Sequence, residues 1–450
     1  MKRLTPHRLI FLSFATAIVV GTIALRVEGS LSAMPLAWTD ALFTATSATC
    51  VTGLVVKDTG SDFSLGGQLI ILALIQLGGL GILTLSSWFL LLLGRRPSLS
   101  GQTALTESFG LPAHLTLRRL LMRAIVYTLA VETVGAVLLF ARFVAIYSPK
   151  RAAYLAVFHS ISAFCNAGFG LFSNSLEDFA NDPWINAVFI ALIALGGLGF
   201  YVLEEIRAAA VSRWRGRPWR WSLHTRVVLA TSVALIAVGA AAIFILESLG
   251  THVATAWHAR LMPALFQSVT ARTAGFNTVD IDQLTNGTIS ILLLLMFIGA
   301  SPGSTGGGIK TTTFAILGAL VVARWRGRSD AEIAGRRIPA DLVAKALAVT
   351  IAFLVGILLC VLILQVTELG GRPHSEVRGE FLELLFETVS AFGTVGLSLG
   401  VTPTLSTAGK LVIVLAMLVG RLGPLSFALT LIGERRRLAY RFPEERILIG

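Results

Sequence analysis

A short motif recurs four times and constrains the fold of this chain more than any other feature. Its copies are Ser47–Leu54, Ser162–Phe169, Thr270–Phe276 and Ser390–Leu397. Each copy combines a small hydroxyl residue and an alanine with a glycine that precedes a bulky apolar residue. Each lies between two long apolar segments and follows a short one that begins at Phe43, Phe158, Phe266 or Phe386. This layout predicts four tandem units of helix, re-entrant loop and helix around one axis.

The apolar content excludes an ordinary soluble domain. The chain is 55% hydrophobic and 14% charged, with a mean hydropathy of +0.78. Because a helix needs about 20 apolar residues to cross the hydrocarbon core, eight segments qualify. They are 9–27, 69–93, 119–144, 186–206, 224–247, 288–321 (interrupted), 343–367 and 409–433. We therefore predict an all-α integral membrane protein with eight transmembrane spans and four re-entrant loops around a central pore.

The repeats divide the chain into five parts. We expect repeat 1 at 1–97, repeat 2 at 114–212, repeat 3 at 222–327 with a broken second helix, repeat 4 at 340–433, and a cytoplasmic tail at 434–450. The net charge of +12 concentrates in alternate loops, where arginine predominates. By the positive-inside rule both termini are cytoplasmic, so this charge predicts contact with lipid or a protein partner and no nucleic acid. Acids after the loops, such as Asp58, Glu177 and Asp280, form either a solvated surface or a cation-attracting vestibule.

The four loops are the predicted ion-binding site. A re-entrant loop can replace the hydration shell of a cation with backbone carbonyl oxygens, and glycine allows the required positive φ. The predicted filter residues are Thr52, Gly53, Ala167, Gly168, Ala274, Gly275, Val395 and Gly396. The negative C-terminal ends of the preceding short helices favour a cation.

A glycine-rich break in repeat 3 is the predicted gate. The run Phe297–Thr311 contains a proline and five glycines, so it cannot remain helical at membrane depth. Its predicted gate residues are Gly303, Ser304, Thr305, Gly306, Gly307, Gly308 and Lys310. A phosphate-binding loop is excluded because Ile309 separates Gly308 from Lys310 and no strand precedes the run.

Arg421 is the second part of the predicted gate. It occupies the position of Gly79, Gly197 and Ala300 in the other repeats. An arginine at membrane depth is costly unless it faces a cavity or finds acceptors, so we expect it to pair with the loop carbonyls and plug the pore; the alternative is an arginine that snorkels to an interface. Glu132 is a second isolated charge, either a structural hydrogen-bonding group or an ion site.

Other glycines and the cysteines have structural interpretations. The runs Gln76–Gly81 and Leu195–Gly199 predict close helix packing, and the alternative is that their glycines weaken the helix where it bends. The three cysteines provide no disulfide framework, and Cys50 and Cys165 are expected to pack behind the loops.

The filter loops, the run Ala271–Asn277, the glycine-rich break and Arg421 together resemble the superfamily of bacterial Trk and Ktr and plant HKT potassium transporters. Within it the chain is most similar to membrane subunits of the KtrB/TrkH type, and closest to KtrB because repeat 1 begins almost at Met1. The resemblance implies K⁺ at the filter carbonyls, since all four filter positions are glycine, whereas sodium-conducting plant relatives carry serine at the first. It also implies a homodimer in the bacterial cytoplasmic (inner) membrane, docked on a cytosolic nucleotide-binding ring of the KtrA/TrkA type. The resemblance implies no cofactor in this chain, and Na⁺ as an activator or coupled ion. The chain has no dinucleotide-binding fingerprint, so the ring must be a separate chain.

Other functional classes fit less well. A voltage sensor would need regularly spaced intramembrane arginines, and an enzyme would need clustered catalytic or metal-binding groups; neither pattern occurs. A sodium- or proton-coupled secondary transporter remains the alternative, because broken helices also occur in such folds.

Overall fold

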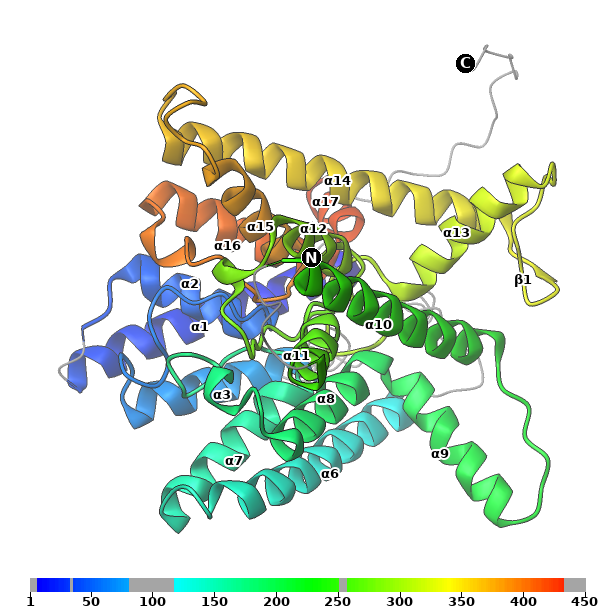
Figure 1. Cartoon of the computed structure of the whole chain (residues 1–450), viewed down its shortest axis with the longest axis horizontal. Coiled ribbons are helices and arrows are strands. Elements are labelled where there is room, and N and C mark those ends of the chain that lie inside the picture. The colour runs from blue at the N-terminus through cyan, green and yellow to red at the C-terminus, as the bar shows by residue number, and fades with distance from the viewer. Residues whose placement is uncertain (1–5, 33–34, 81–116, 251–256, 433–450) are drawn as a thin grey trace, which may run out of the picture.

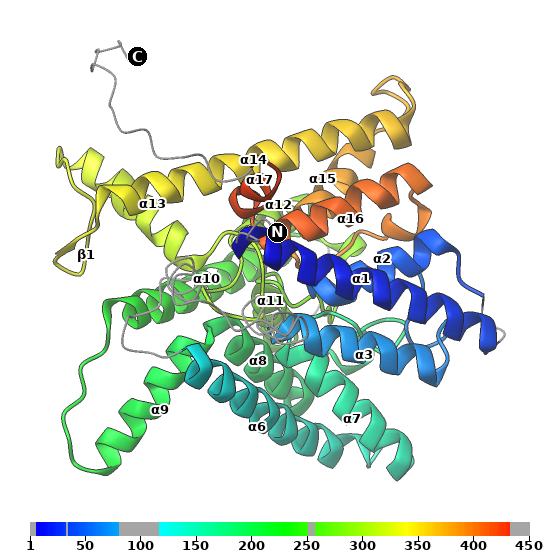
Figure 2. The same ribbon diagram turned by 180° about the vertical axis from the view of Figure 1, so that it is seen from behind.

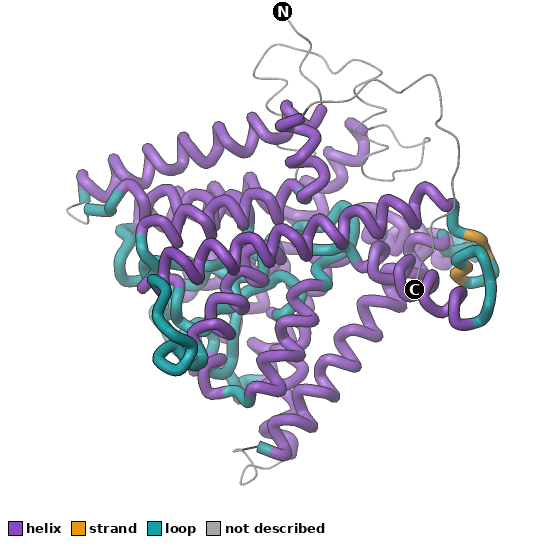
Figure 3. The backbone as a smooth tube through the Cα atoms, turned by 90° about the horizontal axis from the view of Figure 1, so that it is seen from above, coloured by secondary structure: helices purple, strands orange, loops and turns teal. Residues whose placement is uncertain are grey.

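The computed structural model describes residues 6–32, 35–80, 117–250 and 257–432, and these residues are mostly helical (Figure 1). The predicted all-α membrane class is confirmed. Within the described ranges the strands are limited to one antiparallel hairpin, β1 (Glu332–Ile333) and β2 (Arg336–Arg337), at the margin of the helical body (Figure 3). The expected tail at 434–450 and the part of repeat 1 after residue 80 lie outside the described residues.

The same three-helix order occurs four times. The first helices are α1 (Pro6–Leu31), α6 (Leu117–Phe143), α10 (Leu223–Leu249) and α14 (Ala340–Leu369). The short helices are α2 (Trp38–Cys50), α7 (Pro149–Phe164), α11 (Trp257–Thr270) and α15 (Glu380–Gly393). The second helices are α3 (Leu65–Gly79), α8 (Pro183–Leu198), α12 (Asn286–Phe297) and α16 (Thr407–Leu422). The short helices begin before the predicted phenylalanines, each of which is instead fully buried within its helix.

The four units close into a ring. Each second helix contacts the short helix of the next unit: α3 with α7, α8 with α11, α12 with α15, and α16 with α2. In Figure 1 α14 and α6 lie on opposite sides and α10 faces the viewer, whereas α1 faces the viewer in Figure 2. The short helices therefore converge at the centre, surrounded by the first helices.

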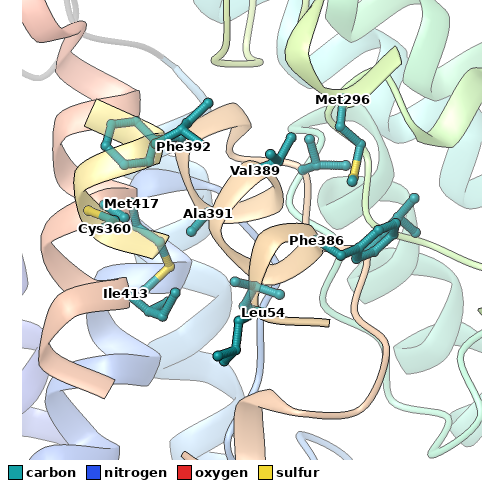
Figure 4. Close-up of a cluster of buried hydrophobic side chains, with 14 of the residues drawn as sticks. Leu54, Met296, Cys360, Phe386, Val389, Ala391, Phe392, Ile413 and Met417 are labelled. Carbon is teal, nitrogen blue, oxygen red and sulfur yellow. The ribbon is translucent and has the colours of Figure 1, made fainter. Parts of the chain in front are cut away.

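Side chains of the short helices form much of the core. Phe386, Ala391 and Phe392 of α15 are almost completely buried. Figure 4 shows Cys360 of α14 and Met417 of α16 together on one side of α15, and Phe386 on the other side. Burial of apolar side chains at this density fixes the direction of α15, and with it the position of the loop that follows Gly393.

Two of the predicted second helices are not continuous. The segments expected as single spans at 186–206 and 409–433 bend by 104° between α8 and α9 (Phe200–Trp214) and by 100° between α16 and α17 (Pro424–Ile432). The bends lie at Gly199 and Gly423, with φ of 90° and 83°, which glycine adopts without steric cost. Bending was the alternative to packing for the glycines of the Leu195–Gly199 run, and it is observed at Gly199, whereas the bend at Gly423 was not predicted. The break predicted in repeat 3 is observed between α12 and α13 (Thr311–Trp325).

The bends change the count of spans. Among the described residues four helices, all of them first helices, are long and apolar enough to cross a membrane, and there are up to six if each bent pair is one span. Three shorter apolar helices, α3, α12 and α13, fall below that length. The chain is thus a multi-pass membrane protein, and in the part that the structure describes its second helices are short or bent.

A carboxylate clasp joins the first and second helices in three units. Glu28, Glu247 and Glu368, near the ends of α1, α10 and α14, accept hydrogen bonds from Ser64, Thr285 and Ser406, the N-cap residues of α3, α12 and α16. In the second unit Asp182 is itself the N-cap of α8 and pairs with Arg142 at 2.6 Å. In units 3 and 4 the carboxylate also accepts from the amide of the N-cap residue, Thr285 or Ser406, which a helix start leaves without a partner inside the helix.

We expect Glu247→Ala to destabilise the protein. Its carboxylate accepts from Thr285 N, Thr285 Oγ1 and Thr288 Oγ1 at 3.1, 2.9 and 2.6 Å. Because each hydrogen bond to a charged group contributes about 1.5–3 kcal/mol, the variant should lose about 3 kcal/mol of unfolding free energy. Thermal unfolding in detergent measures the loss, with the exposed Glu376→Ala as a control that should leave the midpoint unchanged. An unchanged midpoint for Glu247→Ala would show that water replaces the carboxylate.

Candidate functional site

The four predicted filter glycines meet in a closed ring. A Cβ atom placed on any one of them would lie within 3.1 Å of the carbonyl oxygen that precedes the glycine of the next unit. The distance from the added Cβ atom to that oxygen is 2.7 Å for Gly53 and Ala167 O, 3.1 Å for Gly168 and Ala274 O, 2.6 Å for Gly275 and Val395 O, and 2.2 Å for Gly396 and Thr52 O. The structure therefore brings together all eight predicted filter residues, in the cyclic order of the chain.

Each loop repeats one unusual backbone conformation. The four glycines have φ of 95°, 71°, 79° and 93°. The residue two positions before each glycine also has positive φ: Val51 (56°), Asn166 (57°), Thr273 (74°) and Thr394 (49°). This conformation is costly for a β-branched residue. Its recurrence at three such side chains means that packing around the ring imposes it.

The hydroxyl residues of the motif hold the loops. In every unit the amide that precedes the glycine donates to the carbonyl oxygen of the hydroxyl residue, at 2.8, 2.8, 2.9 and 2.9 Å for Thr52, Ala167, Ala274 and Val395. Ser47 Oγ and Ser390 Oγ accept from the amides of Gly53 and Gly396 at 3.1 and 3.0 Å. Ser162 Oγ and Thr270 Oγ1 instead donate to the carbonyl oxygens of Phe169 and Phe276 at 2.7 and 2.6 Å.

These hydroxyl residues and the positive-φ residues were not among the predicted site residues. The signal that could have identified the hydroxyls is their recurrence at a nearly constant distance before each glycine. The positive-φ residues share no side-chain chemistry, and no sequence signal marks them.

Glycines of the second helices allow close contact with the short helices. A Cβ atom on Gly78, Gly196 or Gly420 would lie 2.1, 2.0 or 2.1 Å from the carbonyl oxygen of Thr49, Phe164 or Phe392. The packing predicted for the first two is thereby confirmed. Unit 3 differs, because Gly299 lies against the carbonyl oxygen of Gly307 in the glycine-rich loop.

The glycine-rich loop between α12 and α13 is anchored to unit 2. The amides of Ser301 and Thr305 donate to the carbonyl oxygens of Gly197 and Gly196 at 3.0 and 3.2 Å. The amide of Phe200 donates to Gly303 O at 3.0 Å. The bend at Gly199 therefore exposes an amide that the loop satisfies, which is consistent with the rule that irregular backbone in a membrane protein needs internal partners.

The middle of the loop lies against the filter loops. A Cβ atom on Gly306 would lie 2.0 Å from Thr273 Oγ1, and one on Gly307 would lie 2.2 Å from Thr394 Oγ1. Lys310 Nζ donates back to Gly306 O and Gly307 O at 2.8 and 3.3 Å. The predicted gate segment is therefore within contact of two of the four positive-φ residues, next to the glycine ring.

The remaining loop residues complete the turn. Ser304 N donates to Ser301 O at 3.3 Å. Gly308, with φ of 69°, packs against Gly299, where a Cβ atom on Gly308 would lie 2.9 Å from Gly299 Cα. Ile298 and Ile309 form an isolated parallel bridge that closes the loop at its base.

Arg421 joins this loop to unit 1. Its Nη1 donates to Thr305 O and its Nη2 donates to Gly78 O at 2.5 Å. The side chain is 5% exposed, so it does not snorkel to an interface. Because one guanidinium carries several donors in a fixed fork, it can bridge two carbonyl oxygens from different units.

Glu132 lies between units 1 and 2. It accepts from Gln76 Nε2 at 3.2 Å and from Cys165 Sγ at 3.6 Å, and it is buried. These contacts favour the structural interpretation of Glu132. Cys50, Cys165 and Cys360 are unpaired and buried. Within the described ranges no group of histidine, cysteine and acidic residues could hold a metal ion.

The acids that follow the loops mainly organise their own turns. Asp58 Oδ1 accepts from the amide of Gly60 at 2.7 Å, and Asp280 Oδ1 accepts from the amide of Asp282 at 3.2 Å. Glu177 accepts from Asn277 Nδ2 at 2.8 Å. Burial and the neighbouring Asp280 raise the pKa of Glu177 above its usual value.

A closed ring of four glycine loops, each at the end of a short helix inside a helical membrane body, defines a pore-loop protein of the ion-translocating class. The chain belongs to the TrkH family of cation transport proteins, whose family model matches residues 11–435. This family is one of transporters and not of enzymes, and the family expected from the sequence is confirmed.

Several relatives cover the whole chain. The Ktr system potassium uptake protein B of Bacillus subtilis is 37% identical over 100% of this chain and 97% of its own length. The potassium/sodium uptake protein NtpJ of Enterococcus hirae is 35% identical over 100% of this chain and 98% of its own length. The crystal structure of the potassium transporter TrkH from Vibrio parahaemolyticus superimposes with a TM-score of 0.75 at 20% identity, covering 96% of this chain and 85% of that one. It supports the fold.

Proposed function

We propose that this chain is the potassium-translocating membrane subunit of a Ktr/Trk-type uptake system in the bacterial cytoplasmic membrane. The observation that carries the proposal is the closed ring of Gly53, Gly168, Gly275 and Gly396. The names of the full-length relatives support potassium as the transported ion. Backbone carbonyls of the filter residues replace the hydration shell of K⁺, and no cofactor takes part.

The glycine-rich loop and Arg421 close the ion permeation path next to the filter. The loop contacts Thr273 and Thr394, and Arg421 adds a positive charge in a region of low dielectric constant, where repulsion of a cation is strong. Opening moves the loop away from the filter. Its glycines allow that movement because they present no side chain to be displaced.

Regulation comes from other chains. The subunit forms a homodimer with one pore in each copy, and a cytosolic nucleotide-binding ring of the KtrA/TrkA type binds its cytoplasmic face, where both termini lie. The Ktr system names of the relatives support such a partner. The ring acts on the loop through α13, which begins at Thr311 immediately after Lys310. Na⁺ serves as an activator that need not flow down its own gradient, and coupling to Na⁺ belongs to the alternative that the flux measurements below test. The name of the Enterococcus hirae relative gives sodium uptake beside potassium uptake for that protein.

Flux measurements test this function. We expect the purified protein in proteoliposomes to carry K⁺ down its own gradient when no sodium or proton gradient is present, because a pore needs no second ion. The potassium, sodium and proton gradients are varied independently, and liposomes without protein provide the background. Potassium movement that stops whenever the sodium or proton gradient is removed would overturn the channel-like proposal in favour of the coupled secondary transporter.

A further inference from the structure

One buried polar position recurs on the four short helices. It lies nine residues before the filter glycine in units 1, 2 and 4 and eight residues before it in unit 3, where the loop is one residue shorter. The four residues are Thr44, His159, Gln267 and Glu387. Their exposed fractions are 2%, 0%, 1% and 0%. Polar side chains buried to this degree normally have hydrogen-bond partners, and the four units differ in what this side chain contacts.

Glu387 binds the segment that follows Gly396. Its carboxylate accepts from Ser398 Oγ and, at 2.7 Å, from Thr402 Oγ1. The backbone amides of Leu399 and Val401 also face this carboxylate. Two hydroxyl donors and two amides from five consecutive residues therefore surround one carboxylate, and charge-assisted hydrogen bonds are stronger than neutral ones. This segment cannot move without breaking the two hydrogen bonds from Ser398 and Thr402.

His159 binds the corresponding segment of unit 2 through an imidazole ring instead of a carboxylate. Its Nδ1 donates to Leu155 O at 2.8 Å within its own helix, so Nε2 accepts from the amide of Leu171 at 3.2 Å. The ring stacks on Phe172 at 4.7 Å between centroids. Leu171 and Leu399 each lie three residues after their glycine, so His159 and Glu387 face equivalent amides.

We call this hydrogen bonding, from the short helix to the segment after the filter glycine, a brace. Unit 3 lacks a brace. Both amide atoms of Gln267 are buried without a hydrogen-bond partner. The segment after Gly275 is held instead from unit 2, since Ser175 Oγ accepts from Asn277 N at 3.1 Å and Leu176 N donates to Asn277 O at 2.9 Å. In unit 1 the position carries Thr44, whose side chain is the shortest of the four.

We propose that Glu387 and His159 are positioning residues that hold filter loops 4 and 2 rigid and so set the discrimination between cations. Units 2 and 4 lie opposite each other, because the ring closes in the order 1, 2, 3, 4. The filter is then stiff along one diagonal and more compliant along the other, although its four glycines are alike. This inference rests on the proposed function, because it assumes that the glycine ring selects the ion.

The test measures the ratio of K⁺ to Na⁺ flux in proteoliposomes for Glu387→Gln and His159→Phe. Glu387→Gln replaces an acceptor oxygen by a donor that faces other donors, and His159→Phe keeps the ring packing but leaves the Leu171 amide unpaired. Since the loss of one such hydrogen bond corresponds to about a tenfold change in an equilibrium, each ratio should fall by about tenfold. Ser398→Ala removes a donor from the segment and leaves Glu387 in place, so it should lower the ratio less and remains informative if Glu387→Gln does not fold.

Matched controls separate positioning from simple destabilisation. Thr388 and Ser160 are the buried neighbours of the two braces, and their hydroxyls donate to Leu384 O and Glu132 O, away from the filter loops. Thr388→Val and Ser160→Ala should therefore keep the wild-type ratio even where total flux falls. Gly53→Ser is the reference for the filter itself.

The outcomes distinguish the two levels of the proposal. A lower ratio for the brace variants, with unchanged ratios for the controls, supports it. If Gly53→Ser lowers the ratio and the brace variants do not, the positioning role is wrong and the filter assignment stands. If Gly53→Ser also leaves the ratio unchanged, both are overturned.

Discussion

Arg421→Ala is expected to raise potassium flux in the absence of any regulatory partner by about tenfold or more. Each charge-assisted hydrogen bond that is lost corresponds to about 1.5–3 kcal/mol, and about 1.4 kcal/mol shifts an equilibrium tenfold. Arg421 donates to Thr305 O in the glycine-rich loop and to Gly78 O at the end of α3. Without it the closed arrangement loses both hydrogen bonds. The repulsion of K⁺ by the guanidinium also disappears. Flux into proteoliposomes that contain this chain alone measures the change.

The ratio of K⁺ to Na⁺ flux should remain near that of the wild type in Arg421→Ala, because the glycine ring is untouched. Arg421→Lys is the matched variant: it keeps the charge but lacks the fork that reaches two carbonyl oxygens. Its flux should fall between those of the wild type and Arg421→Ala. If selectivity were lost in Arg421→Ala with no rise in unregulated flux, Arg421 and the loop would support the filter and the gate would lie elsewhere.

The four-unit layout could be predicted because its signal is local. Each loop motif spans fewer than ten consecutive residues. Its repetition between apolar segments can be recognised in the sequence without knowledge of distant contacts. The same recurrence identified Gly53, Gly168, Gly275 and Gly396, which the structure brings into one ring. The excess of proline and glycine between Phe297 and Thr311 likewise predicted a broken helix from composition alone.

The bends at Gly199 and Gly423 could not be predicted in this way. Hydropathy continues through both positions, so the sequence shows one apolar segment where the structure has two helices. The amide freed at Phe200 is satisfied by Gly303 O, in a loop that follows about a hundred residues later. At Gly423 the following Pro424 is a local signal of a helix break, whereas at Gly199 the compensating carbonyl lies in a distant segment and leaves no local pattern.

The partners of Arg421 were predicted in part: a carbonyl oxygen of the glycine-rich loop was expected and Thr305 O supplies it, whereas Gly78 O in unit 1 was not expected. The expectation of backbone carbonyl acceptors follows from the cost of an unpaired buried charge, and the loop was the nearest source of such acceptors. Thr305 and Gly78 lie 116 and 343 residues away in the chain. The choice of these two carbonyls depends on how four units close into a ring, which a single sequence does not specify.

Substitution of the filter glycines should reduce the ratio of K⁺ to Na⁺ flux to different extents in the four units. An added Cβ atom would lie 2.2 Å from Thr52 O at Gly396, 2.6 Å from Val395 O at Gly275, 2.7 Å from Ala167 O at Gly53, and no closer than 3.0 Å to any atom at Gly168. All four positions have positive φ, which adds strain for any other residue. We therefore expect Gly396→Ala to be the most damaging and Gly168→Ala the least.

Gly53→Ser is the most informative single change, because its contacts are intermediate and its hydroxyl can replace part of a hydration shell. The side chain would push against Ala167 O and the Cα of Gly168, 2.9 Å away, and so turn a neighbouring carbonyl away from the ion. A loss of about 1.4 kcal/mol in the preference for K⁺ lowers the flux ratio about tenfold. Uptake of K⁺ and Na⁺ by the variant is compared in cells that lack other potassium importers, with Gly423→Ala as the control, since Gly423 also has positive φ but a Cβ atom there meets nothing within 4 Å. If Gly53→Ser and Gly423→Ala gave the same ratio as the wild type, the close approach of the four glycines would serve packing, and selection of the ion would have to occur at another constriction.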